Sequence, residues 1–157
     1  MKKTWILLSV VAFFAAVLVS YAAATDAAFM GTWKLNAAKS KLTPGAGSNE
    51  TVVYAMAGED VKVTVDGVDG EGKPTHNEWT GKFDDKDYAV TGDPTSDMRS
   101  YKLVNDHTLD ITVKKDGKVT VKGKIEVSKD GKTRTVAVKG TDAAGKKIDS
   151  TGVYDKQ

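Results

Sequence analysis

The sequence predicts an all-β protein whose chain forms an antiparallel up-and-down meander of about ten strands closed into a β-barrel. Three observations support this fold class. Apolar and polar residues alternate with a period of two along most of the chain, which is typical of strands with one dry and one wet face. Short polar turns separate the alternating runs, and no helical period lies between them, which favours hairpins over βαβ units.

The expected strands follow from the alternation, taken in order along the chain. The clearest run extends from Val119 to Val127, where Val121, Gly123 and Ile125 share one face. The same pattern gives the full set of expected strands: 29–36, 50–57, 61–68, 74–81, 87–91, 98–104, 108–114, 118–128, 132–140 and 146–155. The link 37–49 contains Pro44 and two glycines, so it has room for at most one short helix, Ala37 to Leu42.

The turns favour a closed barrel over the alternative of a two-layer sandwich. Asp-Gly at 116–117 and at 130–131 tolerates the positive φ angles of tight hairpins. Successive hairpins favour a barrel because sandwiches usually need longer crossovers, and because closure removes exposed strand edges. Gly123, in the middle of the longest strand, is the kind of residue that permits a bend at a barrel corner.

The first two dozen residues have the features of a secretory signal peptide. Lys2 and Lys3 precede an apolar run from Ile6 to Val19, and Ala22 to Ala24 supplies small residues for cleavage. The run is short for a membrane span, which needs about 20 apolar residues. We expect residues 1–24 to be a signal peptide, residues 25–157 to form the barrel domain, and the product to be periplasmic or secreted without a stable membrane span.

Composition excludes several classes of function. The 157 residues contain no Cys, so disulfide and thiolate chemistry are absent. Removal of Lys2 and Lys3 lowers Lys+Arg from 23 to 21, which equals the 21 Asp+Glu, so the expected mature chain is formally neutral. Charges alternate in sign and form no basic stripe, so we expect no nucleic-acid partner.

The ends of the meander carry a family resemblance. The opening Phe29 to Asn36 (FMGTWKLN) resembles the Gly-x-Trp first strand of the calycins, the lipocalins and fatty-acid-binding proteins, and Val153 to Lys156 is similar to the closing strand of the fatty-acid-binding branch. The chain also resembles small exported lipocalin-like domains of bacteria. The resemblance implies a β-barrel that binds a small hydrophobic ligand. It also implies an Arg two residues before Tyr154, where this chain has Gly152.

Candidate ligand-binding residues follow from the strand phase. Arg99 shares a face with Tyr101 and Leu103, and Arg134 shares one with Val136 and Val138. If these faces point inward, the guanidinium groups could hold an anionic group, with hydroxyls and an indole nearby. The predicted ligand-binding residues are Arg99, Tyr101, Arg134, Tyr154, Tyr54 and Trp79.

Structural roles stand beside this interpretation. Each Arg could extend to the barrel rim or pair with a buried carboxylate, and Met98, Ser100 and Lys102 could form the inward set instead. We expect Trp33 to plug the barrel floor and not to contact ligand. Trp79 could line a pocket or cover a rim.

Catalytic and metal-binding patterns are weak. His76 and His107 are the only histidines, and their spacing matches no short metal motif. The acidic run at 84–87 lacks the glycine and ligand spacing of a calcium loop. No nucleophile elbow, phosphate loop or dinucleotide fingerprint occurs. We therefore expect no enzymatic activity, no metal and no cofactor.

Two functions of different class remain from the sequence. The first is an exported, monomeric carrier or sensor that binds a small hydrophobic or amphipathic, possibly anionic, molecule inside the barrel. The second is a protein-binding module, such as an inhibitor or an envelope-associated adaptor, with a filled core. A carrier needs an apolar cavity with a few convergent polar groups, whereas an adaptor should be packed solid.

Overall fold

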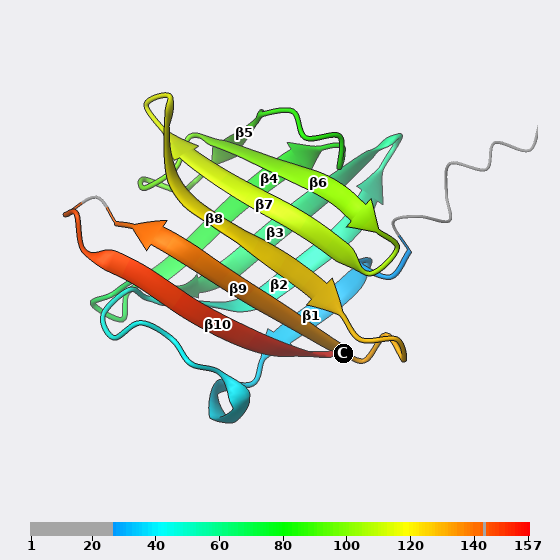
Figure 1. The fold of residues 1–157 in the computed structure, drawn as a ribbon, viewed down its shortest axis with the longest axis horizontal. Coiled ribbons are helices and arrows are strands. Elements are labelled where there is room, and N and C mark those ends of the chain that lie inside the picture. The colour runs from blue at the N-terminus through cyan, green and yellow to red at the C-terminus, as the bar shows by residue number, and fades with distance from the viewer. Residues whose placement is uncertain (1–26, 143) are drawn as a thin grey trace, which may run out of the picture.

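Ten antiparallel strands close into one barrel in the computed structural model, which describes residues 27–142 and 144–157. Each strand pairs with its neighbours in sequence, and the first pairs with the last, so the predicted up-and-down barrel is confirmed (Figure 1). The strands are β1 (Gly31–Leu35), β2 (Ser48–Ala57), β3 (Asp60–Val68), β4 (Pro74–Gly81), β5 (Tyr88–Thr91), β6 (Met98–Asn105), β7 (Thr108–Lys115), β8 (Lys118–Val127), β9 (Thr133–Thr141) and β10 (Lys147–Lys156).

The link between β1 and β2 contains only one turn of 3₁₀ helix, η2 (Ala37–Lys39). The Asn36 side chain caps it by accepting a hydrogen bond from the Lys39 amide at 3.2 Å. The predicted short helix therefore exists but ends earlier than Leu42. The reason is that Lys41 pairs with Thr151 of β10, which draws the chain into extended backbone.

Closure of the barrel depends on the seam between β1 and β10. Here Trp33, Lys34 and Leu35 pair with Lys156, Asp155 and Tyr154. Strand pairing is sparser at β5, which has two register pairs with β4 and two with β6. Closure gives every strand a hydrogen-bonded neighbour on both sides, and the alternate side chains point into a common interior.

The up-and-down order places the connections at two ends of the barrel. The links β1–β2, β3–β4, β5–β6, β7–β8 and β9–β10 lie at one end, which we call the open end and which faces left in Figure 1. The β2–β3, β4–β5, β6–β7 and β8–β9 turns lie at the other, which we call the floor end. The two ends differ in how the interior is filled.

Aromatic rings fill the interior toward the floor end. Trp79 is buried and stands edge-on to Tyr101, with ring centroids 4.7 Å apart, and its indole N–H donates to the Arg99 carbonyl at 2.9 Å. Phe83 lies against Trp79, Tyr101 and Tyr54 at centroid distances of 5.7–6.4 Å. We call Phe29, Tyr54, Trp79, Phe83, Tyr88 and Tyr101 the aromatic floor.

Trp33 also has a packing role, as predicted. Its side chain is fully buried, and its indole N–H donates to the Phe29 carbonyl at 2.8 Å. The Lys156 ammonium lies 5.1 Å from its ring centroid, a cation–π distance at the seam. Trp33 does not line either of the cavities described below.

Gly123 lies on the inner face of β8, where the neighbouring strand approaches closely. A Cβ atom at this position would lie 2.2 Å from the Ala137 carbonyl oxygen of β9. Close backbone approach therefore requires glycine here, whereas the predicted bend at a barrel corner stays a prediction. The predicted signal peptide, residues 1–24, lies outside the described residues. Within the described ranges, no helix is long and apolar enough to cross a membrane.

Candidate binding cavity

The half of the barrel interior nearer the open end is hollow. A cavity of about 250 Å³ lies between the aromatic floor and the open end, and we call it the inner cavity. Its apolar wall consists of aliphatic side chains from six strands and the β1–β2 link: Leu42, Val52, Val65, Ile111, Val113, Val121, Ile125, Val136, Val138 and Ile148. Such an interior suits the apolar part of a small molecule.

Arg134 projects into this cavity as a buried cation. Its side chain comes from the start of β9, and the residue is 4% exposed. Its Nη2 donates to the Tyr54 hydroxyl at 2.9 Å, while its Nε and Nη1 have no hydrogen-bond partner in the described chain. The guanidinium carbon lies 5.0 Å from the Tyr54 ring centroid and 5.1 Å from that of Tyr154. These rings attract the cation through their faces but do not neutralise its charge.

Arg134 has no acidic partner in the part of the chain that the structure describes. No Asp or Glu oxygen there lies within 4.0 Å of its guanidinium nitrogens, whereas Arg99 has Asp93 at that distance. A buried charge without a counter-ion costs several kcal/mol. Two guanidinium nitrogens are thus buried without a hydrogen-bond partner among the described residues, in a side chain that lines the inner cavity.

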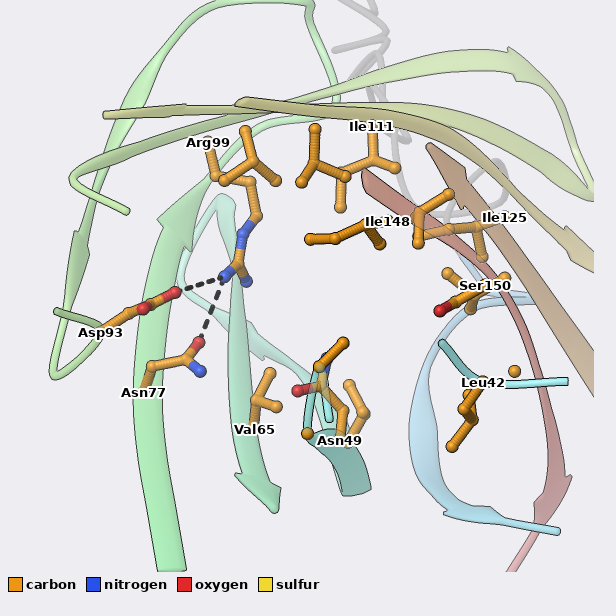
Figure 2. Close-up of a pocket in the computed structure, with 18 of the residues that line it drawn as sticks. Leu42, Asn49, Val65, Asn77, Asp93, Arg99, Ile111, Ile125, Ile148 and Ser150 are labelled. Carbon is orange, nitrogen blue, oxygen red and sulfur yellow. Dashed lines mark hydrogen bonds and ion pairs between the residues drawn. The ribbon is translucent and has the colours of Figure 1, made fainter. Parts of the chain in front are cut away.

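Arg99 lines the same cavity but is already engaged. Its Nη2 lies 3.3 Å from Asn77 Oδ1, to which it donates, and 4.0 Å from Asp93 Oδ2 (Figure 2). Its Nε has no hydrogen-bond partner among the described residues. Figure 2 shows the side chain reaching from its strand toward Asp93 and Asn77, with Ile148 and Val65 facing the same space. Arg99 therefore has a carboxylate partner, whereas Arg134 has none among the described residues.

Asp93 holds the β5–β6 loop as well as facing Arg99. It accepts hydrogen bonds from the Thr95 amide at 2.8 Å and from the Ser96 hydroxyl at 2.6 Å. Burial raises the pKa of Asp93, but these hydrogen bonds and the Arg99 charge outweigh burial and lower its pKa below the usual value. Asp93 is therefore ionised at neutral pH.

The phenols beside Arg134 are neutral. Burial raises the pKa of Tyr54 far above its usual value, and the Arg134 charge only partly offsets this effect. Burial also raises the pKa of Tyr154, against the same opposing charge. The Tyr154 hydroxyl donates to the Asn49 carbonyl at 3.1 Å. The charged side chains that line the inner cavity are then Arg99, Arg134 and Asp93, which leaves one net positive charge.

A second cavity of about 400 Å³ adjoins the first at the open end, and we call it the outer cavity. The two share Ala46, Asn49, Asn77, Asp93 and Thr95, so the inner cavity continues toward the loops. The outer lining is acidic. Its charged members in the described chain are Asp69, Asp93 and Asp142, with no Lys or Arg.

The structure brings together most of the predicted site residues. Arg99, Tyr101, Arg134 and Tyr154 line the inner cavity, so the predicted inward phase of both arginines is confirmed. Tyr54 lies outside the lining and holds Arg134 through its hydroxyl. Trp79 lies in the aromatic floor and lines neither cavity, because β4 places Asn77 at the cavity and Trp79 nearer the floor end. Its contact with a ligand stays a prediction.

Two residues of the site escaped the sequence prediction. Asn77 shares the inward phase of Trp79, and this alternation was a usable signal. Asp93 gave no such signal because it lies in a loop outside any strand pattern, and only the fold places it beside Arg99.

Metal binding has no assembled site in residues 27–142 and 144–157, where no group of three or more acidic or histidine residues could hold an ion. His76 lies on the outer face of β4, with its Nδ1 2.7 Å from Asp66 Oδ1. His107 lies in the β6–β7 turn, far along the chain from His76. The expected absence of metal and of enzymatic activity stays a prediction.

Comparisons with known proteins add only weak likeness. No family model and no curated protein matches this sequence. Among solved structures, EF1p2_mFAP2b bound to DFHBI matches at 14% identity and a TM-score of 0.48, and covers 85% of this chain and 98% of its own. A de novo designed fluorescence-activating beta barrel matches at 14% identity and a TM-score of 0.41 with the same coverage. At these scores neither supports an inference about function, and membership of the calycins stays a prediction.

Proposed function

We propose that this protein binds a small amphipathic monoanion inside its barrel, with the anionic group on Arg134 and the apolar part against the aliphatic wall. The observation that carries the proposal is the buried Arg134 guanidinium, which lines the inner cavity and, among the described residues, has no carboxylate partner and two nitrogens without a hydrogen bond. An anionic ligand would supply the missing counter-ion and charge-assisted hydrogen bonds.

Charge and shape limit the class of ligand. The inner lining has one net positive charge, which one negative charge neutralises. A volume of about 250 Å³ fits a molecule of on the order of ten non-hydrogen atoms, since liquid water takes roughly 30 Å³ per molecule. The alternative, a protein-binding module with a filled core, receives less support because the interior nearer the open end is hollow.

Calorimetric titration with three amphiphiles of equal chain length tests the proposal. Octanoate should bind, octanol should bind at least about tenfold more weakly, and octylammonium should not compete, because a hydrogen bond to a charged group contributes about 1.5–3 kcal/mol. Equal affinities for octanoate and octanol would contradict an anion site.

Arg134→Met separates binding from stability. The variant should lose at least about tenfold in octanoate affinity. Its free energy of unfolding should change by less than about 1 kcal/mol or rise, because an uncompensated buried charge has been removed. Lys124→Met is the matched control: it removes a cation from β8 that pairs with Asp110 at 3.3 Å and is half-exposed, so octanoate affinity should not change.

We also propose that the protein is exported, on the strength of the amino-terminal sequence pattern, and that the resemblance to small lipocalin-like exported domains reflects a common carrier role. Amino-terminal sequencing of protein purified from its own host should begin at Thr25. Native mass spectrometry and organic extraction of the same sample should reveal a bound acid. A solid interior with no extractable molecule would favour the adaptor instead.

A further inference from the structure

The two adjoining cavities have opposite charge. The inner lining has two arginines against Asp93, whereas the outer lining has three aspartates and, in the described chain, no Lys or Arg. Asp93 is the one charged residue common to both, and it faces Arg99. The remaining negative charge of the outer cavity therefore comes from Asp69 and Asp142, at the open end.

Asp69 and Asp142 occupy equivalent positions in their loops. The Asp69 Oδ1 accepts hydrogen bonds from the amides of Glu71 and Lys73, at 2.8 and 2.9 Å. The Asp142 Oδ1 accepts from the amides of Ala144 and Lys146, at 2.9 and 2.8 Å. The pKa of Asp69 lies below its usual value because of the backbone hydrogen bonds from Lys73 and Glu71. In both loops, every hydrogen bond found for the carboxylate in the described chain uses Oδ1.

An anion that enters through the outer cavity passes these carboxylates, which repel it. A ligand with a positive group at its far end resolves this conflict, because that group stays at the mouth when the anionic end reaches Arg134. The same ligand neutralises the inner cavity and complements the outer one.

We propose that the preferred ligand is a zwitterionic amphiphile, with its carboxylate on Arg134 and an ammonium group in the outer cavity near Asp69 and Asp142. This inference rests on the proposed anion site and adds the chemistry of the ligand's other end. It distinguishes the ligand from a simple fatty acid, whose methyl end would lie among carboxylates and polar loop groups.

A series of eight- and twelve-carbon acids that differ only in the terminal group tests this inference by calorimetric titration. The ω-ammonium acid should bind about fivefold more tightly than the ω-hydroxy acid, since partly exposed ion pairs have small individual effects. The α,ω-diacid should bind most weakly of the series. The preference for ammonium should decrease as salt concentration rises, because these charges face solvent.

Asp69→Asn combined with Asp142→Asn removes both charges but keeps each Oδ1 acceptor, so the loops should keep their hydrogen bonds. This variant should lose the preference for the ammonium acid and should bind the unsubstituted acid at least as well as the parent. Asp130→Asn is the matched control, because the Asp130 Oδ1 accepts from the Lys132 amide at 3.1 Å in a turn at the floor end. It should keep the preference.

The outcomes separate this inference from the function on which it rests. Equal affinity for the ammonium and hydroxy acids, or a preference that survives in the double variant, would overturn the zwitterionic ligand. If octanoate still binds in that case, the anion site itself stands. Failure of every acid in the series to bind would overturn the anion site and this inference together.

Discussion

The floor half of the barrel is packed with aromatic rings, whereas the half beneath the open-end loops is walled by short aliphatic side chains and encloses a cavity of about 250 Å³. Both halves belong to the same strands and follow the same alternation. What differs is the size of the inward residues. Trp79 and Tyr101 face inward in the floor half, while valines and Gly152 face inward in the half nearer the open end. Strand pattern thus builds the wall, and side-chain volume decides whether the interior is solid or hollow.

Truncation of the floor should cause the largest loss of stability. Trp79→Ala removes a buried indole that contacts three other rings and donates to the Arg99 carbonyl at 2.9 Å. The free energy of unfolding should fall by about 4 kcal/mol, as for other buried aromatic side chains replaced by Ala. Urea denaturation followed by circular dichroism measures the change. A loss below about 1 kcal/mol would mean that the floor is not the stable half.

Removal of the Asp93 charge should have an intermediate effect that depends on pH. Asp93→Asn should lower the free energy of unfolding by about 1 kcal/mol at pH 7, because Arg99 loses its carboxylate partner. The folded-state pKa of Asp93 is lower than its usual value, so its stabilisation is present above that usual value and is lost as pH falls through the folded pKa.

The pH dependence supplies the check on this assignment. Denaturation curves of parent and Asp93→Asn protein should differ by a constant amount from pH 5 to pH 7 and converge below about pH 4, near the ordinary pKa of Asp. Curves that stay parallel into acid would show that Asp93 does not act through its charge.

Truncation within the hollow half should have the smallest effect. Ile148 on β10 lines the inner cavity and is partly exposed. Ile148→Ala should lower the free energy of unfolding by no more than about 1 kcal/mol, well below the 2–5 kcal/mol typical of a packed site, because the cavity already deprives this side chain of neighbours. The same urea titration used for Trp79→Ala gives a direct comparison. A loss as large as that at Trp79 would mean that the cavity collapses around Ile148.

The sequence predicts the wall of this barrel well because the information is local. Alternation and Asp-Gly turns set each strand to within two residues of the observed bounds, including the 10 residues of β8. The inward phase of Arg99 and Arg134 follows from the same alternation, because neighbouring inward positions hold Tyr101 and Val136. Period two is a property of a strand that needs no knowledge of its partners.

The content of the interior is less predictable because it depends on distant contacts. The pairing of Arg99 with Asp93, and the lack of a carboxylate beside Arg134 in the described chain, both depend on which loops close over which strands. The position of Trp79 shows the same limit. Its phase is inward, as the alternation allows, but its height along the barrel places it in the aromatic floor and not in the cavity.

The β1–β10 seam brings the two extremes of the meander side by side, and the Gln157 amide donates to the Thr32 carbonyl at 3.0 Å. Trp33 and Lys156 are register partners there, so the wall is a continuous ring in which no strand is structurally first. A circular permutant that joins these extremes through a short linker and starts at the exposed β8–β9 turn would therefore retain every strand pairing. The order of translation could change while the architecture stayed the same.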